Sequence, residues 1–374
     1  MNSYKNALND LNVFINNNIL SYSKNRNYDH GPSKRDNVSM LSKYITHRII
    51  SEYDIVSLAL AKNSYSSIEK YIQEVFWRIY WKGWLEHRPS VWEDYFKFND
   101  GDFDIERFKS AENSNTDIDC FNSWMDELKS RNYLHNHTRM WFASIWIFTL
   151  KLPWQLGANL FMKYLYDGDA ASNTLSWRWV AGLQTIGKHY VATSENISKY
   201  TNKKFNPTNL NEYPKPINSE KAYNIGDLKY SNCASYNDSL IIFENNLDFI
   251  NNKKLLGNYK KILLLFLDNN DRKLKICNNV LSFKYSLVDE YSKTIPHSQI
   301  ISSSELKKNI EECSQFDILY PGVGENLSYL QKLKFKSEPN YICNEHDIFC
   351  WKYAKKGFFN FKKNIPTIIN KIIL

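Results

Sequence analysis

The sequence predicts an α + α/β protein, in which an all-helical first half precedes a parallel α/β second half. Before residue 200, apolar residues recur at helical spacing and no segment alternates convincingly as a strand. After a polar stretch with three prolines, short apolar runs alternate with amphipathic ones. We therefore expect a helical domain at 1–205, a linker at 206–227 and an α/β domain at 228–374.

Four segments of the first half have a clear helical pattern. Segment 65–86 carries apolar residues at helical spacing, and no proline interrupts it. Segment 138–150 is apolar almost all round, which predicts a buried helix that ends before Pro153. The same spacing predicts helices at 156–166 and 173–182.

The second half alternates between strand and helix signals. Buried strands are expected at 239–244, 261–267, 299–302 and 317–320. Helices are expected between and after them at 280–294, 304–313 and 325–333. This alternation predicts a parallel sheet with helices on its faces.

Composition and charge limit the classes of function. A length of 374 residues favours two domains. The net charge of +8 favours an anionic partner, although an ordinary basic surface explains it equally well. The six scattered cysteines predict reduced thiols rather than disulfides or an iron–sulfur cluster. With no long apolar stretch, we expect a cytoplasmic monomer that does not contact a membrane.

The segment 167–179, DGDAASNTLSWRW, concentrates groups that can hold a ligand. Its two carboxylates, Asp167 and Asp169, accept hydrogen bonds or bind a cation, and the Asn173 amide both donates and accepts. Trp177 and Trp179 add stacking surfaces and redox-active indoles. The spacing by itself is only suggestive of a cofactor site.

The segment 71–90 places Glu74, Trp77 and Arg78 on adjoining turns of one helix face. A surface ion pair beside a tryptophan core would explain this pattern. A carboxylate and a guanidinium flanked by indoles are costly to desolvate, however, so a bound ligand explains them better.

Two further segments can bind ligands. In 133–141, YLHNHTRMW, His135 and His137 lack a third ligand at zinc spacing, so we expect no metal. In 37–42, NVSMLS, the serines suit a helix N-cap, and the same helix start could bind an anion.

Taken together, these segments resemble the photolyase/cryptochrome family over about 22–205. The resemblance implies a photolyase-like helical domain that binds FAD. It places FAD contacts at Tyr22, Ser39, Leu41, Ser42, Arg78, Asn136, Arg139, Asp167, Asp169 and Asn173. It places substrate contacts at Glu74, Trp77, Asn136, Met140 and Trp179, and catalytic roles at Glu74, Asn173, Trp177 and Trp154.

Some positions depart from the family pattern. Trp177 and Trp154 match the first two members of the family's electron-transfer chain, but the third falls near Gly101. Trp92, Trp124 or a tyrosine would have to replace it. His137 stands where a DNA-contacting arginine is usual, and Val38 replaces a threonine.

The family resemblance implies blue-light-driven repair of cyclobutane pyrimidine dimers in UV-damaged DNA, by electron transfer from reduced flavin. Asn136 and Met140 favour this lesion, because (6-4) photolyases have histidines at both positions. The alternative is a cryptochrome-like blue-light photoreceptor that binds FAD without repairing DNA. A third reading is a helical nucleic-acid-binding protein without a cofactor.

Family members usually place a Rossmann-like α/β antenna domain before the helical one. Here the strand–helix half follows, and SLIIFENNLDFI, KILLLFLD and DIFCWKYAKKGFFNFKKNIPTII resemble parts of that antenna domain. We therefore expect a circular permutation, which is easy where domain termini lie at the surface. The resemblance leaves open whether an antenna chromophore binds there, and the sequence does not identify one.

Overall fold

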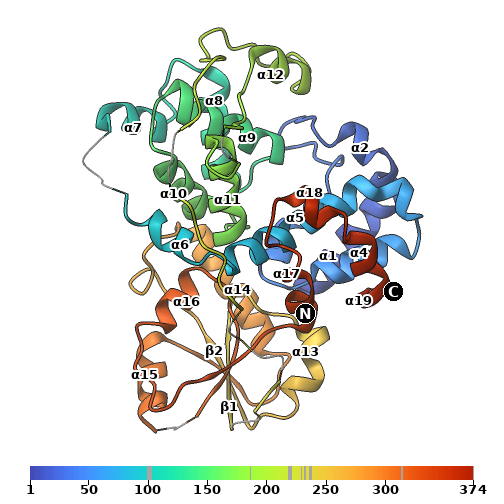
Figure 1. Cartoon of the computed structure of the whole chain (residues 1–374), viewed down its shortest axis with the longest axis vertical. Helices are drawn as coiled ribbons and strands as arrows, with labels where there is room; N and C mark the ends of the chain where they lie inside the picture. Colours follow the sequence, from blue (N-terminus) through green and yellow to red (C-terminus); the bar gives the residue numbers. More distant parts are fainter. Residues whose placement is uncertain are drawn as a thin grey trace.

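The computed structural model describes residues 1–98, 103–185, 187–217, 221–228, 230, 233–235, 238–312 and 315–373. Helices fill most of the molecule, and a parallel sheet with its own helices lies at one end (Figure 1). This architecture confirms the predicted α + α/β class.

The helices predicted in the first half are confirmed, with small shifts at their ends. They are α5 (Tyr65–Glu86), α9 (Asn136–Ser144), α10 (Trp154–Tyr164) and α11 (Ala170–Ala181). Helix α9 continues as a π-helical turn, η2 (Ile145–Thr149), which completes the buried segment predicted before Pro153. The other helices of this half are α1 (Asn2–Asn17), η1 (Ile19–Ser21), α2 (Tyr22–Asn25), α3 (Ser42–Thr46), α4 (Glu52–Leu60), α6 (Ser90–Tyr95), α7 (Ile105–Glu112), α8 (Asp119–Arg131) and α12 (Ser194–Tyr200). Within the described ranges, no helix has both the length and the apolar character needed to cross a bilayer.

The second half forms a five-stranded parallel sheet in the order β3-β2-β1-β4-β5. Its strands are β1 (Ser239–Phe243), β2 (Lys261–Leu265), β3 (Ser298–Ile301), β4 (Asp317–Leu319) and β5 (Asn340–Ile342). The first four were predicted, whereas β5 was missed because its residues do not form an apolar run and only Ile342 among them is buried. The strand order reverses between β1 and β4, where sheets of this kind usually bind ligands.

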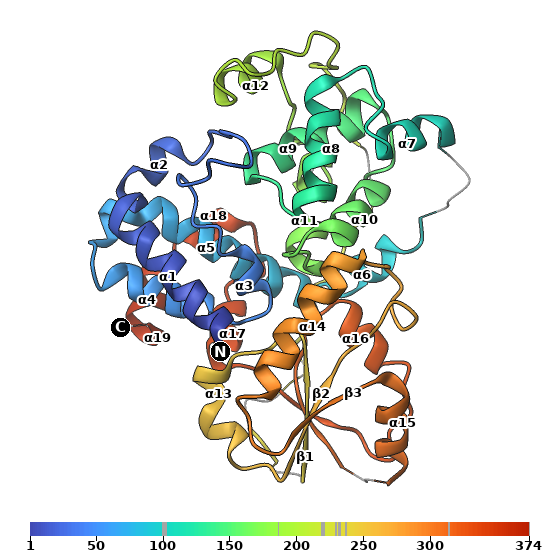
Figure 2. The same ribbon diagram turned by 180° about the vertical axis from the view of Figure 1, so that it is seen from behind.

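Four helices accompany these strands. They are α13 (Phe249–Leu256), α14 (Asn278–Ser292), α15 (Ser303–Glu312) and α16 (Glu325–Leu330). The predictions at 280–294, 304–313 and 325–333 match the last three, although position 313 lies outside the described residues. Figure 2 shows α14, α15 and α16 beside the strands.

The chain between the two halves, 206–227, contains neither helix nor strand where it is described. It runs along the helical half, since the Ile217 N–H donates to the Ala181 carbonyl (3.1 Å) and the Gly226 N–H to the His87 carbonyl (2.8 Å). The domain boundaries expected from the sequence stay a prediction.

The last helices return to the helical half. They are α17 (Glu345–Trp351), α18 (Phe358–Lys362) and α19 (Ile365–Ile372), and α17 and α18 pack against α5 (Figure 1). Asp347 at the buried side of α17 pairs with Arg48 and accepts a hydrogen bond from the Tyr53 hydroxyl (2.9 Å). The Trp351 ring lies so close to Gly83 that a β-carbon there would approach it to 2.4 Å. The end of the chain therefore completes the packing around α5.

The close approach of Trp351 predicts that Gly83→Ala destabilises the protein. Alanine favours a helix by about 1 kcal/mol over glycine, but the overlap with Trp351 and Ala354 should outweigh this and cost about 1–3 kcal/mol net. Urea unfolding would measure the change. Gly357→Ala is the matched control, because no atom lies within 4 Å of the added carbon. Equal stability of the Gly83→Ala variant and the wild type would contradict this packing.

Candidate functional site

A buried ion pair joins α9 to the loop before α11. The Arg139 Nη2 lies 2.9 Å from the Asp167 Oδ2, and the Asp167 side chain is only 2% exposed. Burial alone would raise the pKa of Asp167, but the Arg139 charge and the nearby Ser42 hydroxyl hold this pKa below its usual value. Asp167 is therefore an ionised carboxylate inside the protein.

A second pair of charges, Arg78 and Asp169, lies between α5 and the start of α11. Arg78 donates to the Thr46 hydroxyl, and its Nη2 lies 3.6 Å from the Asp169 Oδ2. Thr46 in turn donates to the Asp167 carbonyl (3.2 Å). Asp169 caps α11, since its Oδ1 accepts from the N–H groups of Ala171 and Ser172. These contacts bring α3, α5 and α11 together at one place.

Several buried polar atoms at this place have no hydrogen-bond partner among the described residues. They include Arg78 Nε, Asp169 Oδ2 and Ser172 Oγ. Buried polar atoms are nearly always paired, so a cluster of unpaired ones indicates a missing ligand that both donates and accepts. The residues present thus fit a polar cofactor such as a flavin nucleotide.

The loop before α3 contributes the predicted serines. Ser42 begins α3 beside Asp167, Leu41 is buried, and Ser39 is hydrogen-bonded to Tyr71. Tyr22 lies edge-on to Tyr71 at 5.2 Å between ring centroids. Burial and the nearby Glu74 raise the Tyr22 pKa well above 10, so Tyr22 remains a neutral hydrogen-bonding group.

Asn173 and Trp177 both point into the packing between α10 and α11. The Asn173 Nδ2 donates to the Ala158 carbonyl (2.9 Å), which fixes the orientation of the amide. The Trp177 ring packs against Gly157, where a β-carbon would approach it to 2.2 Å, and its buried Nε1 has no partner among the described residues. Only glycine at 157 leaves room for this indole.

The predicted electron-transfer residue Trp154 is stacked on Tyr95, with 5.5 Å between ring centroids. Tyr95 in turn lies 5.4 Å from Trp92. Trp124 stacks instead on Trp141, at 5.5 Å. Position 101, which the family pattern aligns with the third tryptophan, lies outside the described residues. Of the replacements considered, Tyr95 is therefore in contact with Trp154, and Trp92 is linked to Trp154 through Tyr95.

The two tryptophans expected to stack on the substrate each contact another aromatic ring. Phe358 of α18 lies parallel to Trp77, with 3.5 Å between ring centroids. Trp179 stacks on Tyr190 at 5.7 Å. The sequence did not indicate either partner, because both contacts are made by residues outside the motifs.

The other substrate-side residues lie nearer the surface. Glu74 is one-quarter exposed and pairs with Lys70 (2.8 Å) on the preceding turn of α5. Asn136 is exposed at the start of α9, and Met140 is partly buried one turn later. All three are therefore accessible from outside.

The histidines of the 133–141 segment are interior groups. His137 stacks on Trp141 at 4.2 Å, and its ring nitrogens lie 3.0 Å from the Asn27 carbonyl and 3.2 Å from the Tyr190 hydroxyl. Burial lowers the pKa of His137 to about 4 and that of His135 to about 3. Both are uncharged at neutral pH, so His137 does not supply the positive charge of the arginine usual at its position.

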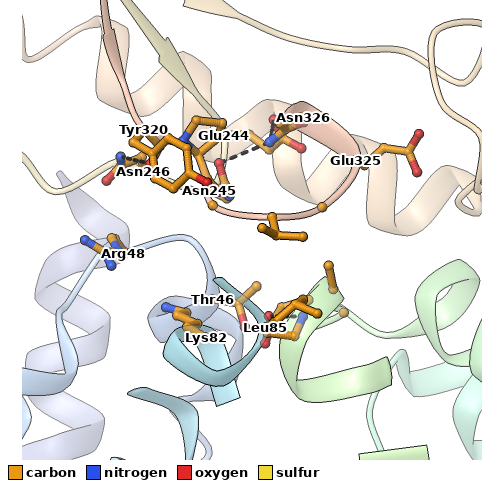
Figure 3. A pocket seen from close by; sticks show the side chains of 18 of the residues that line it. Thr46, Arg48, Lys82, Leu85, Glu244, Asn245, Asn246, Tyr320, Glu325 and Asn326 are labelled. Atoms are coloured by element: carbon orange, nitrogen blue, oxygen red, sulfur yellow. Dashed lines mark hydrogen bonds between the residues drawn. The ribbon is translucent and has the colours of Figure 1, made fainter. Parts of the chain in front are cut away.

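A pocket that the sequence motifs did not indicate lies between the helical half and the sheet (Figure 3). Residues after β1 and β4 form one wall, and residues of α3, α5 and α11 form the other. Glu244, directly after β1, is buried between Arg272 (2.9 Å) and Lys284 (3.6 Å), and these charges lower its pKa to about 2 although burial opposes them. The pocket therefore lies at the point where the strand order reverses.

Glu86 at the end of α5 lines this pocket, and it has no cationic partner in the part of the chain that the structure describes. Its carboxylate accepts hydrogen bonds from the Tyr320 hydroxyl (2.7 Å) and the Val323 N–H (2.7 Å). Burial raises its pKa to about 7, and the nearby Asp347 adds to this effect. Glu86 thus ties the loop after β4 to the helical half and exchanges its proton near neutral pH.

Comparison with known proteins shows what this part of the chain is similar to. Residues 71–222 match the FAD-binding domain of DNA photolyase. The chain is 26% identical over 220 residues to the deoxyribodipyrimidine photo-lyase of Buchnera aphidicola, covering 55% of this chain and 45% of that protein. It is 31% identical over 152 residues to that of Streptomyces griseus, covering 40% of this chain and 33% of that protein. The chain therefore spans less than half the length of these relatives.

Two solved structures that match part of this chain are a photolyase and a cryptochrome. A class III photolyase from Agrobacterium tumefaciens is 25% identical, with a TM-score of 0.47, and the match covers 53% of this chain and 42% of that one. A Synechocystis cryptochrome is 21% identical, also with a TM-score of 0.47, covering 53% of this chain and 43% of that one.

The segment 71–222, which is similar to the FAD-binding domain of DNA photolyase, contains the ion pairs described above. The chain is thus similar, over part of its length, to members of the photolyase/cryptochrome family.

The buried pair predicts that Arg139→Ala lowers the free energy of unfolding by about 3–5 kcal/mol at neutral pH, because Asp167 remains charged without its partner. Asp167 has a lowered folded-state pKa, so its contribution to stability is present above its unfolded pKa and is lost as the pH falls through the folded one. The difference between variant and wild type should therefore shrink in acid.

Urea unfolding at several pH values would test this. Lys109→Ala removes an exposed ion pair with Glu106 and should cost less than about 1 kcal/mol. An Arg139→Ala variant no less stable than this control would show that the buried pair is unimportant.

The raised pKa of Glu86 predicts a different pH dependence. The folded carboxyl keeps its proton up to about pH 7, whereas the unfolded one loses it near 4.5. As the pH rises across this window, the free energy of unfolding of the wild type should therefore fall relative to that of Glu86→Gln. The expected fall is a few kcal/mol, because each unit of pKa difference corresponds to about 1.4 kcal/mol. Thermal unfolding from about pH 4 to 8 would measure it, with the exposed Glu93→Gln as control. Parallel curves for Glu86→Gln and wild type would contradict the assignment.

Proposed function

We propose that the protein is an FAD-dependent enzyme that repairs cyclobutane pyrimidine dimers in DNA under blue light. The observation that carries the proposal is the cluster of Arg78, Arg139, Asp167 and Asp169, with its unpaired buried atoms, inside a segment that matches the FAD-binding domain of photolyase. The relatives named deoxyribodipyrimidine photo-lyase support the choice of reaction.

In this proposal the chain binds and orients the flavin, which when bound supplies an excited electron. Arg78, Arg139, Asp167 and Asp169 hold it by charge and hydrogen bonds, and Tyr22, Ser39, Leu41, Ser42 and Asn136 complete the binding set. Asn173 presents an uncharged amide whose orientation is fixed by Ala158. The dry, pre-formed charges of this site need no reorganisation when the cofactor arrives.

The substrate side is assigned to the accessible residues of α5, α9 and α11. Glu74 supplies a partly exposed carboxylate that can hydrogen-bond to a damaged base, while Trp77, Met140 and Trp179 supply apolar and stacking surface. The net charge of +8 favours a phosphate backbone as the partner.

A second candidate is a cryptochrome-like photoreceptor that binds FAD without repairing DNA. Two observations favour it. His137 is buried and uncharged where a DNA-contacting arginine would stand in photolyases. Trp77 and Trp179 are also already stacked on Phe358 and Tyr190, which leaves less of their surface for a flipped base.

We also propose that the order of the two halves is a circular permutation of the order usual in the family. The parallel sheet after residue 227 supports this, as does the return of α17 and α18 to α5. In that arrangement the family's α/β domain would occupy 228–374.

Light-dependent repair separates the two candidate functions. Protein with reduced flavin should restore thymines in an oligothymidine that carries cyclobutane dimers under blue light, and not in the dark. Glu74→Ala should weaken repair without changing flavin content, because the Glu74 carboxylate pairs with Lys70, which is not one of the proposed flavin contacts. Absence of restored thymines under illumination would reject repair and leave the photoreceptor.

The ring contacts predict which tryptophans carry electrons to the flavin. Trp177→Phe and Trp92→Phe should slow photoreduction of the bound flavin, because Trp92 reaches Trp154 through Tyr95. Trp124→Phe is the control and should leave the photoreduction rate unchanged, since Trp124 stacks on Trp141 instead. Transient absorption after a light pulse would measure the rates. Equal photoreduction rates in the Trp177→Phe variant and the wild type would show that Trp177 does not carry electrons to the flavin.

A further inference from the structure

The last helices carry an exposed, positively charged surface around one aromatic ring. Lys355, Lys356 and Lys363 are exposed, and Phe359 between them is 77% exposed. We call these four residues the C-terminal patch. An exposed phenylalanine among lysines is the combination that single-stranded nucleic acids bind, through phosphates and base stacking together.

The backbone of the C-terminal patch is held rigidly. The Tyr80 hydroxyl donates to the Lys356 carbonyl (3.0 Å), and the Arg88 Nη2 donates to the Lys355 carbonyl (2.8 Å). Phe358 and Phe361, on either side of Phe359, are buried. The lysines and Phe359 are therefore presented from a fixed scaffold, which lowers the entropy lost on binding.

The lysines of the patch are free to bind phosphate. Among the residues that the structure describes, Lys355, Lys356 and Lys363 form no ion pair, whereas the neighbouring Lys362 pairs with Glu69 (3.4 Å). A cation without a carboxylate partner loses no internal contact when it binds a phosphate. It also releases counterions from the nucleic acid, which favours binding at low salt.

The patch lies next to a proposed substrate residue. The Phe359 ring lies 6.4 Å from that of Phe358, and Phe358 is stacked on Trp77 of α5. Helix α18 packs along α5 (Figure 1). The C-terminal patch is thus an extension of the surface to which Trp77 and Glu74 belong.

We propose that the C-terminal patch binds the DNA strand beside the damaged nucleotides, with its lysines on the phosphates and Phe359 stacked on an unpaired base. This inference rests on the proposed function for its choice of DNA. It also explains how a chain with an uncharged His137 at the usual arginine position could hold a duplex, because the positive charge comes from the other end of the chain.

An anionic lipid surface is the other polyanion that a basic, aromatic segment could bind. The apolar side of α19, formed by Ile365, Ile368 and Ile369, is buried against the protein. Interfacial helices bind membranes through an apolar side of this kind, but the apolar side of α19 is not accessible. The observations therefore favour DNA.

Equilibrium binding in the dark tests the patch separately from repair. The probes are a fluorescein-labelled single strand and a duplex with one thymine dimer, over a range of salt concentrations. The Lys355→Ala/Lys356→Ala/Lys363→Ala variant should reduce the slope of log affinity against log salt by about 2–3, since each phosphate contact contributes about 0.7–0.9. Phe359→Ala should weaken binding about tenfold. Lys307→Ala/Lys308→Ala, on α15 near the sheet, is the control and should match the wild type.

Two results would overturn the inference: an unchanged salt slope in the triple variant, or a loss of binding to phosphatidylserine vesicles that equals or exceeds its loss of binding to DNA. Flavin content, measured in each variant, shows that the helical half is still folded. Failure of the proposed function gives a different result, namely wild-type protein that binds DNA through the patch but restores no thymines in light.

Discussion

The buried charge of Asp167 constrains the rest of the site. The Asp167 carboxylate, which is 2% exposed, is held ionised by Arg139 at 2.9 Å together with the Ser42 hydroxyl and the Arg78 charge, and removing Arg139 leaves a buried charge without its main partner. The pair fixes α9 against the loop before α11, and Thr46 binds the same loop from α3 through the Asp167 carbonyl. Three segments distant in the sequence therefore meet at Asp167. The ion pair between Arg78 and Asp169 lies beside this residue.

The C-terminal helices α17 and α18 also pack against the helical half, on α5. Trp351 fills the space that Gly83 leaves on α5, and Phe358 covers one side of Trp77. A segment that follows the sheet in sequence thus shapes the surface of the helical half. In the proposed function, Phe358 of α18 therefore limits how much of the Trp77 ring is exposed to the substrate.

The sequence predicted the long elements, but it did not indicate the contacts made between distant segments. Its assignment of residues to the site stays a prediction. Helix 65–86 was predicted because twenty-two residues carry a repeated apolar spacing. Strand β5 (Asn340–Ile342) was missed because its residues do not form an apolar run and only Ile342 among them is buried. The stacking of Phe358 on Trp77 and the raised pKa of Glu86 depend on residues brought together only by folding, so no local motif indicates them.

The most direct test of the account is the visible absorption spectrum of the gently purified protein, before and after addition of FAD. The account requires a flavin nucleotide held by Arg139, Asp167 and their neighbours, and it predicts flavin absorption bands that persist through gel filtration. Colourless protein that takes up no added flavin, although it is folded, would contradict it.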